Sequence, residues 1–224
     1  VAVQSIVFGN DTLIRVIAAA SNATNESGSI VVTNNVGVSF TVESQWRYIE
    51  EGVVTSVQPS IGRLGTVVTI NGTSLRGDGD NVLQVLLGGF AAVIETETDT
   101  SVVVVAGNGT SGGATSDVVL VSSSGAIVTG EDGWTYIDSR ITNVVPNNGQ
   151  VGTYVTITGT DMLGGGGSSL SAISIAGVSP SIVSANDTVI VVRLANTSAG
   201  AGDIVITGSG GSVLTSVDGF TYQA

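Results

Sequence analysis

The residues of this chain best suited to a known chemistry are seven asparagines in the pattern Asn-x-Ser/Thr. The side-chain nitrogen of such an asparagine is the acceptor for N-linked glycans, which require an exposed position. The chain has 13 Asn, so about three such motifs would arise by chance, and seven is more than double that number. The alternative is that Asn, Ser and Thr serve only as turn residues. We expect exposed asparagines that carry covalent N-linked glycans at Asn10, Asn22, Asn25, Asn71, Asn108, Asn186 and Asn196. Such glycans imply that the protein passes through a secretory route.

A loop of sequence RGDGDN, residues 76–81, offers two further chemistries. The tripeptide Arg76-Gly77-Asp78 is a motif that cell-adhesion receptors read, although a polar turn has the same composition. Asp78, Asp80 and Asn81 place oxygen ligands close together, as Ca²⁺ requires. The bidentate acid of a complete calcium loop is missing. A polar turn is therefore the favoured interpretation, and we expect no metal site.

Glu95, Glu97 and Asp99 alternate along one expected strand. Paired carboxylates perform acid–base catalysis when a cleft holds them against a substrate. No partner base can be named here, so a solvated face is the favoured interpretation. The chain has no His and no Cys, which excludes imidazole bases, thiol nucleophiles, disulfides and thiolate metal sites. We therefore expect neither an enzyme nor a cofactor.

The charge balance excludes further classes of partner. The net charge is -12, with only six Lys and Arg. Nucleic-acid binders need a basic surface to displace counterions, and anionic membranes attract basic segments. No apolar run is long enough to span a bilayer. We expect no nucleic-acid partner and no membrane insertion in this segment.

An internal repeat organises the chain. Residues 141–160, ITNVVPNNGQVGTYVTITGT, repeat residues 54–73, VTSVQPSIGRLGTVVTINGT, and Pro146 lies 87 residues after Pro59. β-Branched residues alternate in each copy, which predicts strands with one buried face. We expect a core that includes Val68, Ile70, Val155 and Ile157, with the closing-strand aromatics Trp46, Trp134 and Phe220.

Residues 1–50 match only the second part of the later copies, since Trp46-Arg47-Tyr48 corresponds to Trp134-Thr135-Tyr136. We expect domains at 51–138 and 139–224, preceded by the C-terminal half of a similar domain at 1–50. The closing region of each unit reads as two strands, such as Ala126–Thr129 followed by Gly133–Ile137. The short joints at 50–53 and 138–140 predict that neighbouring units abut.

The repeat, of the form I-x-x-V-x-P-x-x-G-x-x-G-T-x-V-T-I-x-G-T with a closing (W/F)-x-Y, resembles the IPT/TIG domain. The resemblance covers the whole chain as two full copies and one back half. It implies an all-β fold of tandem immunoglobulin-like β-sandwiches, the first one incomplete. Such domains occur in plexin-type receptors, in microbial and algal surface proteins and in Rel-type transcription factors, the last disfavoured here by the acidity. The fold itself says little about function, because one fold can have many different functions.

The incomplete unit suggests a function. A sandwich without its first strands leaves apolar side chains and backbone groups open to a strand from elsewhere. That strand comes either from preceding residues of the same chain or from another copy; a head-to-tail contact between copies gives filaments. We therefore expect an extracellular or cell-surface, glycosylated structural protein. It would be the repeating subunit of a filament or surface layer, with other copies of itself and glycans as partners. The alternative is a segment of an adhesion or receptor ectodomain that binds another molecule through its loops.

Overall fold

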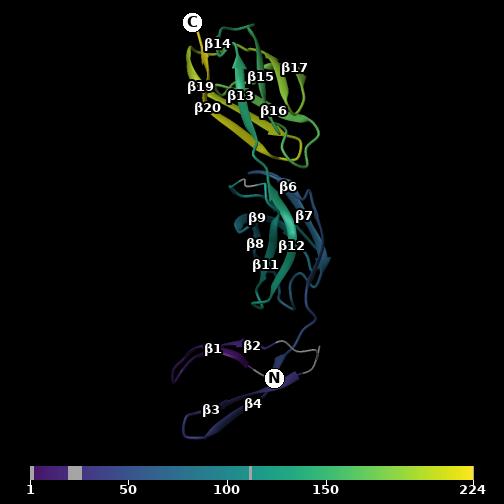
Figure 1. The fold of residues 1–224 in the computed structure, drawn as a ribbon, viewed down its shortest axis with the longest axis vertical. Helices are drawn as coiled ribbons and strands as arrows, with labels where there is room; N and C mark the ends of the chain where they lie inside the picture. Colours follow the sequence, from purple (N-terminus) through teal and green to yellow (C-terminus); the bar gives the residue numbers. More distant parts are fainter. Residues whose placement is uncertain (1–2, 20–26, 111–112, 224) are drawn as a thin grey trace. The chain divides into compact units, whose positions relative to one another are not determined.

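The computed structural model describes residues 3–19, 27–110 and 113–223, and no helix occurs among them. The chain divides into two compact units, Val1–Glu51 and Gly52–Ala224. The second unit holds two sandwiches (Figure 1). We refer to residues 1–51 as the first unit, residues 52–138 as the second sandwich and residues 139–224 as the third sandwich.

The described residues of the second sandwich form eight strands. They form one curled sheet in the order β5-β7-β10-β9-β8-β11-β12-β6, in which only β12 and β6 pair in parallel. The strands are β5 (Val53–Gln58), β6 (Ile61–Gly62), β7 (Val67–Thr73), β8 (Val82–Leu87), β9 (Phe90–Glu97), β10 (Ser101–Val105), β11 (Ser116–Ser122) and β12 (Ile127–Tyr136).

The third sandwich repeats this order in two separate sheets, β13-β15-β18-β17 and β14-β20-β19-β16. Its strands are β13 (Arg140–Val145), β14 (Asn148–Gly149), β15 (Tyr154–Thr160), β16 (Leu170–Ile175), β17 (Ser181–Ala185), β18 (Val189–Arg193), β19 (Gly200–Gly208) and β20 (Val213–Tyr222). We call β5–β8 and β13–β16 front halves. We call β9–β12 and β17–β20 back halves.

The first unit forms two separate hairpins. Its strands are β1 (Val3–Gly9), β2 (Ile14–Ala18), β3 (Ser27–Thr33) and β4 (Ser39–Arg47). β1 pairs with β2 and β3 pairs with β4, both antiparallel. By sequence these four strands correspond to β9–β12, so the first unit consists of a back half.

Both sandwich cores follow the predicted alternation. Val68, Ile70, Val155 and Ile157 are fully buried, as the spacing of β-branched residues requires. Trp134 and Phe220 close the two cores and are also buried. The predicted register of β7 and β15 is therefore confirmed.

The closing strand differs from the prediction. β12 is continuous from Ile127 to Tyr136, where two strands were expected. Its register against β11 shifts between the pairs Ser116–Trp134 and Val118–Gly130, so β12 carries a bulge. Asp132 adopts a left-handed φ of 50° there, and its backbone N–H donates to Asp117 Oδ1 at 3.0 Å. The polar residues between 129 and 133, which were expected to separate two strands, instead form this bulge. Asp218 and Asp203 repeat the arrangement in β20.

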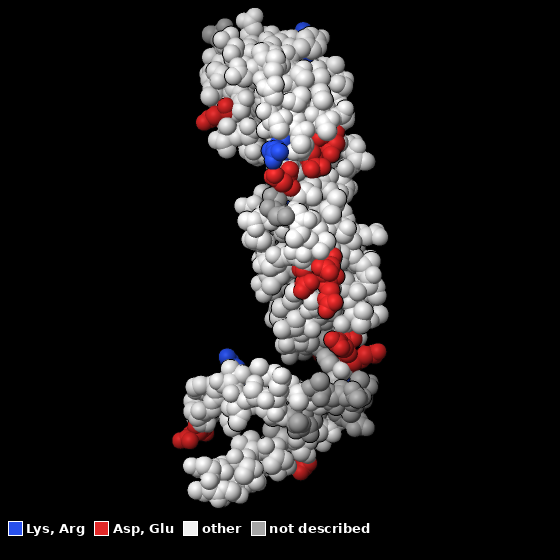
Figure 2. Space-filling model, viewed as in Figure 1, with Lys and Arg blue, Asp and Glu red and all other residues white. Residues whose placement is uncertain are grey.

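The surface is mostly uncharged. Figure 2 shows scattered acidic side chains, few basic ones and wide neutral areas. Within the described ranges, no helix is long and apolar enough to cross a membrane.

Candidate functional site

Two of the predicted glycan acceptors occupy the same tight turn in different repeats. Asn10 lies between β1 and β2, and its Oδ1 accepts hydrogen bonds from the backbone N–H groups of Thr12 and Leu13 at 2.9 and 2.8 Å. Asn186 lies between β17 and β18, and its Oδ1 accepts from Thr188 and Val189 at 2.9 and 2.7 Å. In both turns the Thr hydroxyl also donates to Oδ1. The carboxamide oxygen thus caps the turn, while both asparagines are exposed.

The remaining acceptors fall into three groups. Asn108 and Asn196 are exposed in loops that follow β10 and β18, as expected. Asn71 is only partly exposed because β7 is paired on both sides, and its Nδ2 lies 3.3 Å from Ser56 Oγ. The expectation of an exposed Asn71 was therefore wrong. Asn22 and Asn25 lie outside the described residues.

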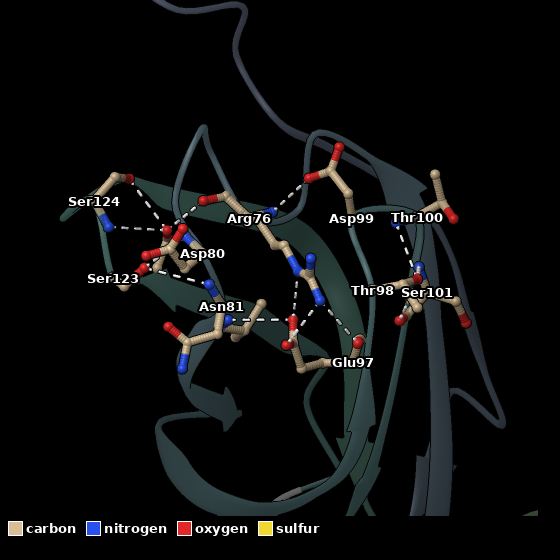
Figure 3. A network of polar contacts seen from close by, with 12 residues as sticks. Arg76, Asp80, Asn81, Glu97, Thr98, Asp99, Thr100, Ser101, Ser123 and Ser124 are labelled. Atoms are coloured by element: carbon tan, nitrogen blue, oxygen red, sulfur yellow. Dashed lines mark hydrogen bonds and ion pairs between the residues drawn. The ribbon is translucent and has the colours of Figure 1, made fainter.

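The RGDGDN loop is held by its own arginine (Figure 3). Arg76 Nε and Nη2 donate to the two carboxylate oxygens of Glu97 at 2.8 and 3.0 Å. The backbone N–H of Arg76 donates to Asp99 Oδ1 at 3.0 Å. The hydrogen bond from Arg76 holds the pKa of Glu97 below its usual value. Arg76 therefore fixes the loop to the end of β9. An adhesion motif would instead need the Arg76 side chain to be available to a receptor.

The same contacts correct the interpretation of the acidic residues. Glu95 is exposed, but Glu97 is not part of a solvated face, because its carboxylate is paired with Arg76. The loop beside it is tied to the β11–β12 hairpin, since Asp80 N–H donates to Ser123 Oγ at 2.9 Å. In the described ranges, no three acidic side chains are placed to hold a metal ion.

A close joint connects the second and third sandwiches. The turn between β6 and β7 pairs with the hairpin between β19 and β20, through Val67 N–H to Gly210 O at 2.9 Å and Val213 N–H to Leu64 O at 3.0 Å. A Cβ on Gly211 would lie 2.6 Å from Gly65 O, so only glycine allows this approach. The joint is therefore a backbone-to-backbone contact like that between strands.

Arg63 completes the joint, and sequence analysis missed it. Its guanidinium donates to Asp161 O at 3.1 Å and Met162 O at 2.7 Å. The residue is only 7% exposed, and burial lowers its pKa to about 10, which leaves it charged at neutral pH. The glycines at 164–167 lie against the same turn, because a Cβ on Gly165 would lie 1.9 Å from Ile61 O. The available signal was this glycine run, which occupies the place of RGDGDN in the preceding copy.

The first unit has open strand edges. In the second sandwich β10 pairs with β7, β11 pairs with β8 and β12 pairs with β6, and these three partners belong to the front half. The corresponding strands β2, β3 and β4 have no such partners among the described residues. Three edges of backbone donors and acceptors are therefore available to a front half.

The apolar side chains of the first unit are exposed for the same reason. Val16, Ile30 and Trp46 are 42%, 42% and 37% exposed, and they line an apolar groove of the first unit. The corresponding Val104, Val118 and Trp134 are all 0% exposed. The groove thus has the side chains of a sandwich core, and no strand among the described residues covers it.

The IPT/TIG domain model matches residues 53–136 and again residues 139–224, which is most of the chain. The chain belongs to the IPT/TIG family. The predicted resemblance and the all-β, tandem immunoglobulin-like fold class are confirmed. IPT/TIG domains are non-catalytic immunoglobulin-like folds. No curated protein matches the sequence.

Several solved structures are similar to this chain at low sequence identity. The extracellular region of plexin A4 is 18% identical and has a TM-score of 0.48, over 81% of this chain and 20% of that one. The surface glycan-binding protein PbSGBP-B from Prevotella bryantii is 19% identical with a TM-score of 0.33, over 75% of this chain and 41% of that one. A Bacteroides ovatus SGBP-B in complex with a mixed-linkage heptasaccharide is 17% identical with a TM-score of 0.31, over 87% and 51%. The chain spans about a fifth to a half of these proteins.

Proposed function

We propose that this chain is an extracellular, glycosylated structural protein, the repeating subunit of a filament or surface layer that assembles by β-strand complementation between copies. The observation that carries the proposal is the set of unpaired edges on β2, β3 and β4. Each of them has a defined partner in the complete sandwich of the same chain. The second sandwich therefore indicates which strand of the complement would pair with each open edge.

The energetic reason for a complement is the exposed core of the first unit. Each Å² of apolar surface in water costs about 25 cal/mol, so several hundred Å² cost on the order of 10 kcal/mol. That is comparable with the whole stability of a small domain. The first unit therefore needs its complement in order to persist folded.

We propose that the complement is a front half from outside the first unit. The described residues contain three back halves and two front halves, and both front halves are already paired within their own sandwiches. A donor copy that gave up one of these would open its own core. In this proposal the donated strands come from a further segment of a neighbouring copy, which adds subunits head to tail without closing.

In this proposal the glycans keep the protein soluble, because its surface carries few charged side chains. Wide neutral areas normally favour association between copies. Sugars at the exposed Asn10, Asn108, Asn186 and Asn196, together with Asn22 and Asn25, would cover part of this surface. Mass spectrometry of native protein before and after glycan removal tests this part. Unmodified asparagine at Asn22, Asn108 and Asn196 alike would contradict it.

The deciding experiment is a structure of the native assembly that traces which chain fills the groove of the first unit. We expect strands of a neighbouring copy beside β2, β3 and β4, repeated along one axis. Continuous density from preceding residues of the same chain would overturn complementation between copies. A monomeric chain that binds another molecule through its loops would favour a receptor or adhesion ectodomain instead.

A further inference from the structure

The turn between β14 and β15 of the third sandwich, residues 150–154, is a structural copy of the turn that forms the joint. In the joint turn, Thr66 N–H donates to Arg63 O at 3.0 Å, and Gly65 has a φ of 85°. In the second turn, Thr153 N–H donates to Gln150 O at 3.1 Å, and Gly152 also has a φ of 85°. The two turns therefore present the same backbone groups.

This second turn carries no partner sandwich among the described residues, and its apolar side chains are exposed. Val151 corresponds to Leu64 of the joint and is 57% exposed. Tyr154 corresponds to Val67 and is 60% exposed. Val67 itself remains 44% exposed within the joint, so this position has room for the larger tyrosine ring.

The first unit has a copy of the hairpin that receives the joint turn. In the receiving hairpin, Gly208 N–H donates to Ser212 O at 2.9 Å and Gly211 N–H to Gly208 O at 3.0 Å. Between β3 and β4, Asn34 N–H donates to Val38 O at 3.0 Å and Gly37 N–H to Asn34 O at 3.1 Å.

The glycine that permits close approach is also present in the first unit. Gly37 has a φ of 84°, as Gly211 has 86°, and a Cβ on Gly37 would have open space around it. Val36 and Val38 beside it are 76% and 65% exposed. The first-unit hairpin thus presents the backbone shape and apolar flanks that the turn of residues 150–154 requires.

We infer that the turn at residues 150–154 docks onto the hairpin Asn34–Ser39 of a second copy of this chain, and so reproduces the joint between copies. The equivalent bonds run from Tyr154 N–H to Val36 O and from Ser39 N–H to Val151 O. This inference rests on the proposed head-to-tail assembly and names its second contact. The hydrogen bonds that Arg63 makes in the joint have no counterpart in this contact. The carbonyls that accept them belong to a front half, and the first unit consists of a back half.

The comparable hairpin of the second sandwich is a poorer acceptor. Gly125 has the same φ of 85°, but the adjacent loop is RGDGDN. Asp78 stands there at the sequence position of Gly165, where a Cβ would come 1.9 Å from Ile61 O in the existing joint; Asn148 holds the position of Ile61 beside the docked turn. Ser124 Oγ also donates to Gly77 O at 2.7 Å, which ties the hairpin to this loop. The first unit is therefore the acceptor that fits.

Engineered cysteines test the contact directly, because the chain has no native Cys. The test pair is Val36→Cys with Tyr154→Cys in the full chain, oxidised in its native assembly and run on a non-reducing gel. Leu64→Cys with Val213→Cys is the positive control, since this pair is hydrogen-bonded across the joint within one chain. Val36→Cys with Val217→Cys is the negative control, because Val217 is 75% exposed on β20, away from the turn. Electron micrographs of the same samples report the filament separately.

We expect a ladder of covalent oligomers from the test pair, with a yield about tenfold above the Val217 control. Gly37→Ala should remove the ladder, whereas Gly125→Ala, which introduces the same φ strain at an open position, should not. Filaments without the ladder would overturn this contact and leave the proposed function standing. A disulfide between the two engineered cysteines of one chain, without the ladder, would also overturn it. The absence of filaments would instead count against the assembly itself.

Discussion

The first unit and the second sandwich contain the same back half, yet only one of them has a core. β1–β4 and β9–β12 match in order, in pairing within each hairpin and in the aromatic residue of the closing strand. Trp46 is 37% exposed and Trp134 is 0% exposed. The difference lies in the front half, which covers one back half and not the other. Local sequence therefore suffices for the hairpins, while burial of the core depends on strands from elsewhere in the sequence.

The largest expected effect comes from the closing-strand tryptophans. Trp134→Ala removes the largest buried side chain of the second sandwich and should lower its free energy of unfolding by about 3–5 kcal/mol. Trp46→Ala in the same chain, without a complement, should change stability by less than about 1 kcal/mol, since its ring is partly in water. Chemical denaturation followed by circular dichroism measures both.

The native assembly sharpens this comparison. If a front half covers Trp46 there, then Trp46→Ala should approach the cost of Trp134→Ala when filament dissociation is measured instead. An equal, small effect of Trp46→Ala in the filament and in the isolated chain would show that the groove stays open.

The next effect uses the same residue type at matched positions. Ile30 on β3 and Ile204 on β19 occupy equivalent sites, and they are 42% and 0% exposed. Ile204→Ala should cost about 2–4 kcal/mol through lost burial and a cavity. Ile30→Ala should cost well under half of that in the isolated chain. Similar losses at both sites would mean that the first unit has a core of its own.

The fold could be predicted from the sequence because apolar and polar residues alternate along most strands, and this alternation determines which side chains are buried. Val68, Ile70, Val155 and Ile157 were assigned to the core from period-2 spacing alone, and all are buried. The strand Ser181–Ala185 carries little alternation and every residue in it is exposed, so residue spacing alone does not predict it.

Contacts between distant segments could not be predicted in the same way. The pairing of Arg76 with Glu97 crosses 21 positions, and the Arg63 contact with Met162 crosses 99. Nothing in the local composition separates an arginine that closes a joint from one in water. The glycine run at 164–167 is visible in the sequence, but its close approach to the turn of the preceding sandwich exists only in three dimensions.

A smaller effect is expected at the joint, where two glycines form a matched pair. Gly211 and Gly125 have φ values of 86° and 85°, so alanine imposes similar backbone strain at both, about 1 kcal/mol. Only at Gly211 would the new Cβ also meet a carbonyl, 2.6 Å away. Gly211→Ala should therefore open the joint and uncouple the thermal unfolding of the two sandwiches, whereas Gly125→Ala should shift the melting temperature and leave one transition.

The smallest expected effect concerns the ion pair that holds the RGDGDN loop. Arg76 and Glu97 side chains are 32% and 18% exposed, so solvent screens the pair and its contribution is modest. The hydrogen bond from Arg76 lowers the pKa of Glu97 in the folded state. Between that lowered pKa and the ordinary value of about 4.3, the unfolded chain binds more protons than the folded one, so stability rises with pH through this window.

Glu97→Gln should remove this pH dependence. The melting temperature of the variant should lie slightly below that of the parent above about pH 5, and the two should converge as pH falls through the lowered pKa. Glu95→Gln is the matched control, because Glu95 lies on the same strand, is exposed and has no hydrogen-bond or ion-pair partner among the described residues. If both variants melt alike at every pH, the carboxylate of Glu97 does not hold the loop. Arg76 would then be available for a receptor, which would revive the adhesion alternative for this tripeptide.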